Sequence, residues 1–154
     1  STFEENALIK ARAVCKALGR IALADDSGLC VEALGGAPGV YSARFCGRHG
    51  DDAANNALLL QKLAGLPAKQ RAAYFESCVA LVFPGGKELT AHGRAYGRIL
   101  EAAEGEGGFG YDPVFYSSEL NKSFGRAGAE EKNAVSHRAK ALAALAEKLA
   151  EEQV

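Results

Sequence analysis

The segment from Ile21 to Gly28, with the sequence IALADDSG, constrains this chain more than any other stretch. Its first four residues form a short apolar run, a pattern typical of a buried β-strand. Two adjacent carboxylates, Asp25 and Asp26, follow this run, and Ser27 comes next. Carboxylates at the end of a buried strand are costly unless a positive charge neutralises them. Because aspartate oxygens suit Mg²⁺ or Mn²⁺, the segment predicts a divalent cation site.

A structural alternative is also open for the same residues. Asp26 could form an Asx turn by capping its own backbone, with Gly28 allowing the bend. Aspartate, serine and glycine in succession are a common turn composition. In either interpretation the strand ends at Asp25, and a second strand is predicted from Leu29 to Leu34.

Length and charge limit the classes of protein to consider. A chain of 154 residues predicts one domain, residues 1–154, with 48% hydrophobic residues to build a core. The net charge of −1 supplies no bulk positive surface, so we expect neither nucleic acid nor a membrane as a partner. The four cysteines form no C-x-x-C pair, which favours reduced thiols in a cytoplasmic protein. The sequence has no signal peptide and no apolar run of transmembrane length, so we expect it to be neither secreted nor spanning.

The remaining patterns predict alternating helices and strands, hence an α/β fold. Thr2 begins a capping box with Glu5, which predicts a helix up to Gly19. In this helix Glu5 has a capping role, and the position of Lys10 alone favours a solvated side chain. We expect a helix capped by Asp51 or Asp52 through residue 63, a β-hairpin with strands at 71–83 and 88–99, and a final helix over 139–152.

A second stretch with chemical character runs from Gly105 to Phe115, with the sequence GEGGFGYDPVF. Such a glycine-rich loop offers backbone amides to anions, and the ring of Phe109 offers a surface on which a base can stack. The spacing differs from that of a Walker loop. The structural alternative is a glycine-rich hairpin with Phe109 in the core.

A third stretch, EEKNAVSHR from Glu130 to Arg138, precedes the last predicted helix. Ser136 can cap that helix, which places His137 and Arg138 in its first turn. Basic residues there oppose the helix dipole and indicate a nearby anion or polar base edge. A surface ion pair with Glu130 or Glu131 would explain them as well.

Four motifs in this order, ADDSGL, GGAPGVYSAR, GGFGYDPVF and EEKNAVSHR, follow a leading TFEENA. Together they resemble the inosine triphosphate pyrophosphatase family (XTP/dITP diphosphatases) over nearly the whole chain. The resemblance implies a two-lobed α/β fold around a long mixed β-sheet with flanking helices, a nucleotide cleft between the lobes, and a homodimer. It also implies Mg²⁺-dependent hydrolysis of ITP, dITP and XTP to the monophosphate and pyrophosphate. We expect the family's N-terminal strand, phosphate loop and acidic segment to be missing here.

The resemblance also implies roles for individual residues. Asp26 matches the catalytic acidic residue, which helps hold the metal and orients or deprotonates the attacking water. Asp25 is expected to assist as a metal ligand, with Glu5 as a weak substitute for the family's missing glutamate. The expected substrate contacts are Ser27, Lys10 toward the phosphates, Phe109, Gly110, Tyr111 and Asp112 around the base, and Lys132, His137 and Arg138 along the purine edge.

Base chemistry agrees with these roles. A 6-keto oxygen accepts a hydrogen bond, and Arg138 or Lys132 can donate one. Adenine presents an amino group instead and would leave a buried charge unpaired, a large penalty for the wrong substrate. Two other hypotheses remain: a truncated nucleotide-binding module without full catalysis, and a Maf-type pyrophosphatase for other modified nucleotides.

Overall fold

A computed structural model describes residues 2–152 of the chain. Its five strands form one sheet in the order β1-β2-β3-β4-β5, with helices beside it, and this confirms the α/β class. The strands are β1 (Ala22–Val31), β2 (Ala72–Val82), β3 (Glu88–Ile99), β4 (Phe115–Ser117) and β5 (Lys122–Ser123). The α-helices are α1 (Phe3–Leu18), α2 (Asp52–Lys62), α3 (Ala129–Val135) and α4 (His137–Glu152).

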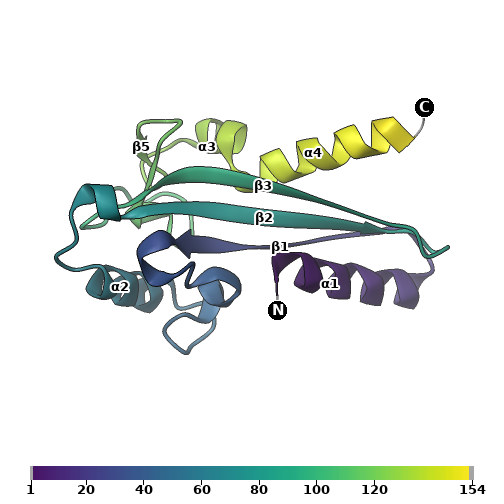
Figure 1. The fold of residues 1–154 in the computed structure, drawn as a ribbon, viewed down its shortest axis with the longest axis horizontal. Coiled ribbons are helices and arrows are strands. Elements are labelled where there is room, and N and C mark those ends of the chain that lie inside the picture. Colours follow the sequence, from purple (N-terminus) through teal and green to yellow (C-terminus); the bar gives the residue numbers. More distant parts are fainter. Residues whose placement is uncertain (1, 153–154) are drawn as a thin grey trace. The chain divides into compact units, whose positions relative to one another are not determined.

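Neighbouring strands of the sheet run antiparallel (Figure 1). A short turn at 83–87, in which the Phe83 amide donates to the Lys87 carbonyl, reverses β2 into β3. The register of β3 against β4 pairs Arg98 with Tyr116. The expected mixture of parallel and antiparallel strands is therefore wrong for the described residues. Parallel neighbours need a long crossover connection, whereas each connection here returns the chain at the end of the sheet where it left.

Strand β1 corrects the predicted break at the acidic pair. It runs without interruption from Ala22 through Asp25 and Asp26 to Val31, so the Asx turn does not form. The predicted second strand is the continuation of the first, and only residues 32–34 turn into a short 3₁₀ helix. The physical reason is burial on the far side of the acidic pair. The residues from Gly28 to Val31 are all buried and hold the chain extended through Asp25 and Asp26.

The chain divides into two compact units, each described here by itself. Unit 1 consists of the described parts of Ser1–Ser27, Glu76–Arg94 and Ser136–Val154. Unit 2 consists of Gly28–Phe75 and Ala95–Val135. Strands β1, β2 and β3 each contribute residues to both units.

In unit 1, helices α1 and α4 cover opposite faces of the strands (Figure 1). A small core of Val79, Ala91, Ala141 and Leu145 lies under α4. Gly93 permits this close packing, because a Cβ there would lie 2.3 Å from the carbonyl oxygen of His137 in α4. The absent side chain at this position therefore sets how near the helix approaches the sheet.

Helix α1 begins and ends where the sequence predicts. The Thr2 hydroxyl accepts from the Glu5 amide at 3.0 Å, and Gly19 takes the left-handed conformation at the other end. Phe3, Ala7, Ala11 and Cys15 form its buried face. Val14 and Leu18, whose helical spacing would place them on the same apolar stripe, are instead 46% and 66% exposed. The buried stripe of α1 is thus narrower than the sequence pattern suggests.

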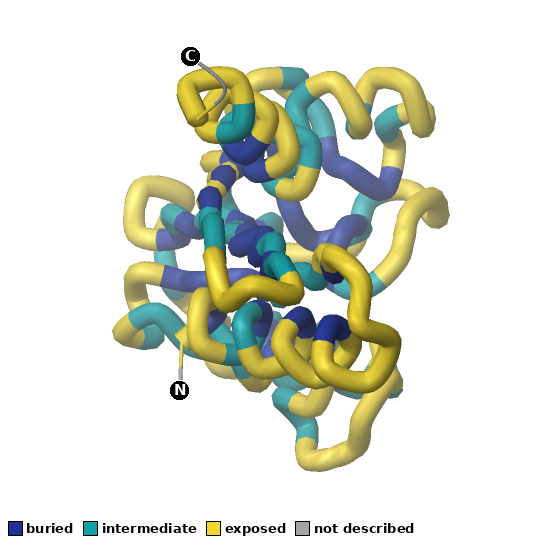
Figure 2. Tube along the Cα trace, turned by 90° about the vertical axis from the view of Figure 1, so that its right-hand side faces the viewer, coloured by how far each residue is buried: buried dark blue, intermediate teal, exposed yellow. Residues whose placement is uncertain are grey.

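Unit 2 has the larger core, built around three packed aromatic rings. The Phe115 ring centroid lies 4.6 Å from that of Phe75 and 5.0 Å from that of Phe124, distances at which tilted rings attract. Arg71 is also buried, and its guanidinium donates to backbone carbonyls, among them Leu63 at 2.7 Å and Ile99 at 2.7 Å. As Figure 2 shows, the buried positions lie mainly along the strands, and the outer helix faces are exposed.

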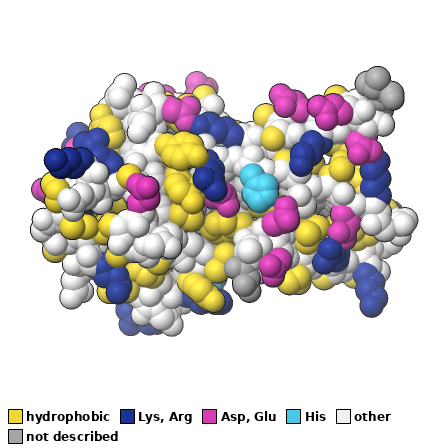
Figure 3. Space-filling view, in the orientation of Figure 1, with side chains coloured by type: hydrophobic (Ala, Val, Ile, Leu, Met, Phe, Trp, Pro, Cys, Tyr) yellow, Lys and Arg dark blue, Asp and Glu magenta, His cyan; other side chains and the backbone are white. Residues whose placement is uncertain are grey.

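The surface carries charges of both signs, as the net charge of −1 suggests, and the cysteines are in the thiol form. Acidic and basic side chains are interspersed over the face in view in Figure 3. All four cysteines are free thiols. Within residues 2–152, no helix combines the length and apolarity needed to cross a bilayer.

Candidate active site

The first group of candidate residues surrounds Asp26 in unit 1. The Asp26 carboxylate accepts from the Asn6 amide at 3.1 Å and from Lys10 Nζ at 3.1 Å. Lys10 Nζ also donates to the Asp25 carbonyl oxygen at 3.0 Å. Asn6 and Lys10 are one turn apart on α1 and therefore face the same strand. The Lys10 side chain is 54% exposed, as its helical position favoured, and its ammonium group is in addition directed at the acidic pair.

The two aspartate side chains point to opposite faces of β1, as successive residues of a strand do. The Asp26 carboxylate meets α1, whereas Asp25 Oδ1 lies 3.7 Å from Arg138 Nη2 in the first turn of α4. The Ser136 hydroxyl accepts from the Ala139 amide at 3.1 Å and caps that helix as predicted. The Arg138 guanidinium in its first turn is thus paired with Asp25. We call Asn6, Lys10, Asp25, Asp26 and Arg138 the acidic cluster.

The acidic cluster has the donor chemistry of a Mg²⁺ site. The Asp26 and Asp25 side chains are 18% and 32% exposed, so their hard oxygen donors can be reached from solvent. Glu5 is exposed on α1, and Ser27 is exposed on β1. Within residues 2–152, the carboxylates of Glu5, Asp25 and Asp26 do not form a group with all ligand atoms inside 4.8 Å. Their joint role as metal ligands stays a prediction.

The second group of candidate residues is the base loop of unit 2, defined here as Gly107 to Asp112. Phe109 is 75% exposed, so its alternative placement in the core is wrong. Asp112 is buried, accepts from the Phe109 amide at 2.9 Å and forms an ion pair with Lys132. Lys132 Nζ also lies 4.2 Å from the centroid of the Phe109 ring, within cation–π range. The loop thus presents an aromatic ring next to a positive charge.

Hydrogen bonds to α2 and to Ser42 fix the rest of the base loop. The Gly110 amide donates to Asp52 at 2.9 Å, and the Gly110 carbonyl accepts from Asn56 at 3.1 Å, so both backbone groups are tied to α2. The buried Tyr111 hydroxyl donates to the Ser42 carbonyl at 2.7 Å. Burial raises the pKa of Tyr111, because the phenolate would lose its hydration. Gly110, Tyr111 and Asp112 therefore shape the loop, while Phe109 faces outward.

Some predicted residues come together and others do not. Phe109, Asp112 and Lys132 form one group in unit 2, whereas His137 and Arg138 belong to unit 1. The shared role of Lys132, His137 and Arg138 along a purine edge remains a prediction. Three supporting residues were missed in the sequence: Asn6, Asp52 and Asn56. Asn6 could have been found from its spacing of four residues before Lys10, but nothing local links α2 to the distant glycine loop.

These features define a class of protein: an α/β chain with a lysine-bearing acidic cluster suited to a metal and phosphates, and a separate glycine-rich loop presenting an aromatic ring. The chain belongs to the Ham1 family, which it matches over residues 1–148. It is 54% identical to a dITP/XTP pyrophosphatase of Leifsonia xyli over 144 residues, which is 94% of this chain and 72% of the relative.

Solved structures show the same similarity. A nucleoside-triphosphatase / dITP/XTP pyrophosphatase from Mycobacterium abscessus superposes with a TM-score of 0.83 at 52% identity, covering 94% of this chain and 74% of that one. The Ham1 protein of Staphylococcus aureus superposes with a TM-score of 0.92 at 42% identity, covering 99% of this chain and 78% of that one.

Proposed function

We propose that this chain is a nucleoside triphosphate pyrophosphatase that hydrolyses the deaminated purine nucleotides dITP, ITP and XTP to the monophosphate and pyrophosphate. The observation that carries the proposal is the identity of 54% over 94% of the chain with a relative named for dITP and XTP hydrolysis. The acidic cluster and the base loop support it, because each has the chemistry that one part of such a substrate needs.

The acidic cluster supports a role in the hydrolytic step. Asp26 accepts a proton from, or orients, the water that attacks the phosphoryl group, and Lys10 donates to the phosphate oxygens on which charge develops. Asp26 would hold Mg²⁺, whereas the Asp25 side chain lies on the other face of β1. When bound, this ion offsets the triphosphate charge and favours the departure of pyrophosphate. The water oxygen remains on one product, and its proton passes by way of Asp26 to solvent.

The base loop supports selectivity for deaminated purines. The exposed ring of Phe109 offers a stacking surface, and the neighbouring Lys132 ammonium can donate to a keto oxygen. The adenine amino group, itself a donor, could not accept from that ammonium group, so adenine would lose the hydrogen bond that a keto oxygen gains. We therefore propose that the loop favours a purine with a 6-keto group over adenine.

The first test is pyrophosphate release from dITP, ITP and XTP in the presence of Mg²⁺, with dATP and GTP for comparison. We expect turnover of the three deaminated nucleotides to be lost in Asp26→Asn and on chelation of the metal with EDTA. Glu147→Gln, an acid-to-amide change at an exposed position of α4, is the control that should keep full turnover.

The outcomes separate the competing hypotheses. Undiminished turnover in Asp26→Asn would exclude the proposed role of this carboxylate. No turnover by the wild type, combined with a higher Tm in the presence of ITP, would favour a nucleotide-binding module without full catalysis. Hydrolysis of other modified nucleotides in preference to ITP and XTP would favour the Maf-type activity.

Phe109→Ala tests the base loop separately. Stacking of a base on an aromatic side chain contributes about 1–3 kcal/mol, so we expect kcat/KM for dITP to fall by roughly 5- to 150-fold. The Tm should change little, because the ring is exposed. A lower Tm together with an unchanged kcat/KM for dITP would contradict the stacking role.

We also propose that residues 1–154 act as one pyrophosphatase domain, in the cytoplasm and as a homodimer. Four free thiols support a reducing compartment. The dimer rests on the family resemblance, and light scattering coupled to gel filtration tests it by distinguishing one copy of the 16.1 kDa chain from two.

A further inference from the structure

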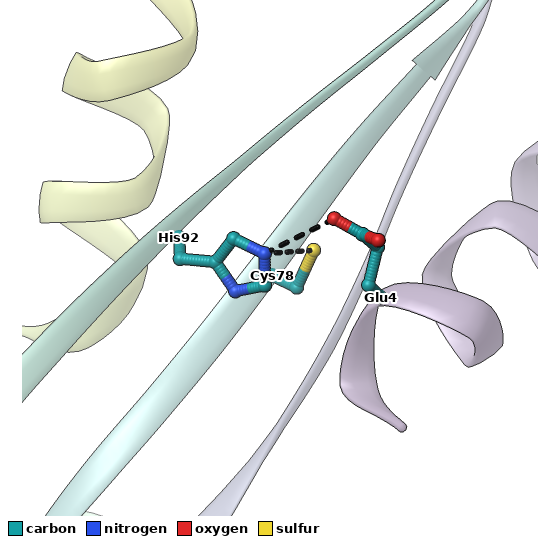
Figure 4. A group of neighbouring side chains, drawn as sticks. All are labelled: Glu4, Cys78 and His92. Carbon is teal, nitrogen blue, oxygen red and sulfur yellow. Dashed lines mark hydrogen bonds and ion pairs between the residues drawn. The ribbon is translucent and has the colours of Figure 1, made fainter. Parts of the chain in front are cut away.

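Three side chains outside the acidic cluster meet on the α1 face of unit 1 (Figure 4). Glu4 comes from α1, Cys78 from β2 and His92 from β3. His92 Nε2 lies 3.7 Å from Cys78 Sγ and 3.3 Å from Glu4 Oε1, and all three potential ligand atoms lie within 4.8 Å of one another. No other trio of His, Cys, Asp or Glu within residues 2–152 is this compact.

We propose that Glu4, Cys78 and His92 form a Zn²⁺ site that is separate from the catalytic metal site. The combination of one thiolate, one imidazole and one carboxylate suits zinc, a borderline-soft ion, whereas Mg²⁺ prefers oxygen ligands alone. Three protein ligands leave the fourth tetrahedral position to water.

The distances between the donor atoms agree with this assignment. Zinc bonds of about 2.3 Å to sulfur and about 2.0–2.2 Å to nitrogen and oxygen, at tetrahedral angles, separate sulfur from nitrogen by about 3.6 Å and nitrogen from oxygen by about 3.4 Å. The corresponding distances here are 3.7 Å and 3.3 Å. The side chains therefore need little rearrangement to surround the ion.

Without a metal the trio has ordinary hydrogen-bond partners. The Cys78 thiol donates to the Val79 carbonyl oxygen at 3.9 Å, and a neutral His92 with a proton on Nε2 can donate to Glu4. Zinc binding would replace both of these hydrogen bonds by bonds to the ion.

The surroundings of the trio favour a fixed site. The Thr90 hydroxyl donates to Glu4 Oε1 at 3.0 Å, the kind of outer contact that orients a metal-binding carboxylate. Cys78 is fully buried, whereas the His92 and Glu4 side chains are 46% and 47% exposed and give access from solvent. Burial raises the pKa of the Cys78 thiol to about 11, so zinc must displace the thiol proton, which passes to solvent.

Titration of the reduced, EDTA-stripped protein with Co²⁺ and then Zn²⁺ tests the proposal. We expect one Co²⁺ per chain to bind with a thiolate-to-cobalt charge-transfer band in the near ultraviolet, and Zn²⁺ to displace it. Cys78→Ser should abolish the band. His92→Gln and Glu4→Gln, which change exposed side chains and so spare the fold, should each weaken Zn²⁺ binding by at least about 10-fold, since even outer contacts of a metal site contribute 10- to 100-fold.

Two controls separate this site from other thiols and from the acidic cluster. Cys46→Ser removes a partly exposed thiol elsewhere, and Asp26→Asn removes the main carboxylate of the acidic cluster; both should keep the charge-transfer band. The proposal is overturned if the wild type binds no stoichiometric Co²⁺ or Zn²⁺. It is equally overturned if the band survives in Cys78→Ser, or if it disappears in Cys46→Ser.

Discussion

Replacement of Lys132 by methionine should destabilise the protein far more than the same replacement of Lys122. The Lys132 and Asp112 side chains are only 15% and 4% exposed, so Lys132→Met leaves a buried carboxylate with the Phe109 amide as its remaining donor. Removing one partner of a buried ion pair costs about 3–5 kcal/mol. At about 2–4 °C per kcal/mol for a chain of this size, the Tm should fall by roughly 6–20 °C.

Lys122 provides the matched control in the same unit. Its ion pair with Glu131, at 2.8 Å, joins side chains that are 39% and 45% exposed. Such a surface pair contributes about 0–1 kcal/mol, so Lys122→Met should lower the Tm by at most about 4 °C. Far-ultraviolet circular dichroism during heating measures both variants.

A double variant tests the cause of the loss. In Lys132→Met/Asp112→Asn the buried carboxylate is gone, so part of the lost stability should return relative to Lys132→Met alone. If Lys132→Met and Lys122→Met lowered the Tm equally, the reasoning from burial would be refuted. If the double variant were less stable than the wild type by the sum of the losses measured in Lys132→Met and in Asp112→Asn, the two side chains would act independently and the ion pair would have no energetic role.

Three further changes test other parts of the structure. Gly93→Ala should lower the free energy of unfolding in urea by about 1–3 kcal/mol or more, because its Cβ would meet the backbone of α4 at 2.3 Å. Gly85→Ala is the control: a Cβ there has nothing within 4 Å, so the free energy of unfolding should be nearly unchanged. Arg71→Met should lower the free energy of unfolding by about 3 kcal/mol or more, since buried carbonyl groups would lose their hydrogen-bond donor. An unchanged midpoint of urea unfolding would contradict this expectation. The raised pKa of Tyr111 means that the folded state holds its phenolic proton longer than the unfolded state. Its contribution to stability is therefore complete below pH of about 10 and declines above it, and Tyr111→Phe should flatten the alkaline fall of Tm.

Features set by local chemistry were predictable from the sequence. Thr2 and Gly19 bound α1 because capping needs only a few neighbouring residues. The hairpin of β2 and β3 followed from β-forming residues around a Pro-Gly-Gly turn, and β3 spans the predicted residues 88–99. Asp51 accepts from the Ala54 amide and caps α2 as expected.

Features set by tertiary burial were not predictable in the same way. Asp25 and Asp26 look like a turn because aspartate, serine and glycine are common in turns, but the buried residues that follow them, Gly28 to Val31, keep them in β1. Exposure of Phe109 could not be decided from composition, since glycine-rich loops place aromatic rings inside and outside alike. The trio of Glu4, Cys78 and His92 spans 88 residues of sequence and has no local motif at all.

The continuation of β1 through the acidic pair bears on the chemistry of the site. In a turn, two adjacent carboxylates could converge on one ion, but in a strand they face opposite sides. Asp26 shares its side with Lys10 and Asn6, a cation and a neutral donor that would meet an anionic substrate as readily as they meet the carboxylate. Asp25 is instead neutralised by Arg138 on the other side. The strand therefore gives the two aspartates unequal positions. Asp26 has the surroundings expected of the reacting carboxylate, and Asp25 has those of a residue that fixes the first turn of α4.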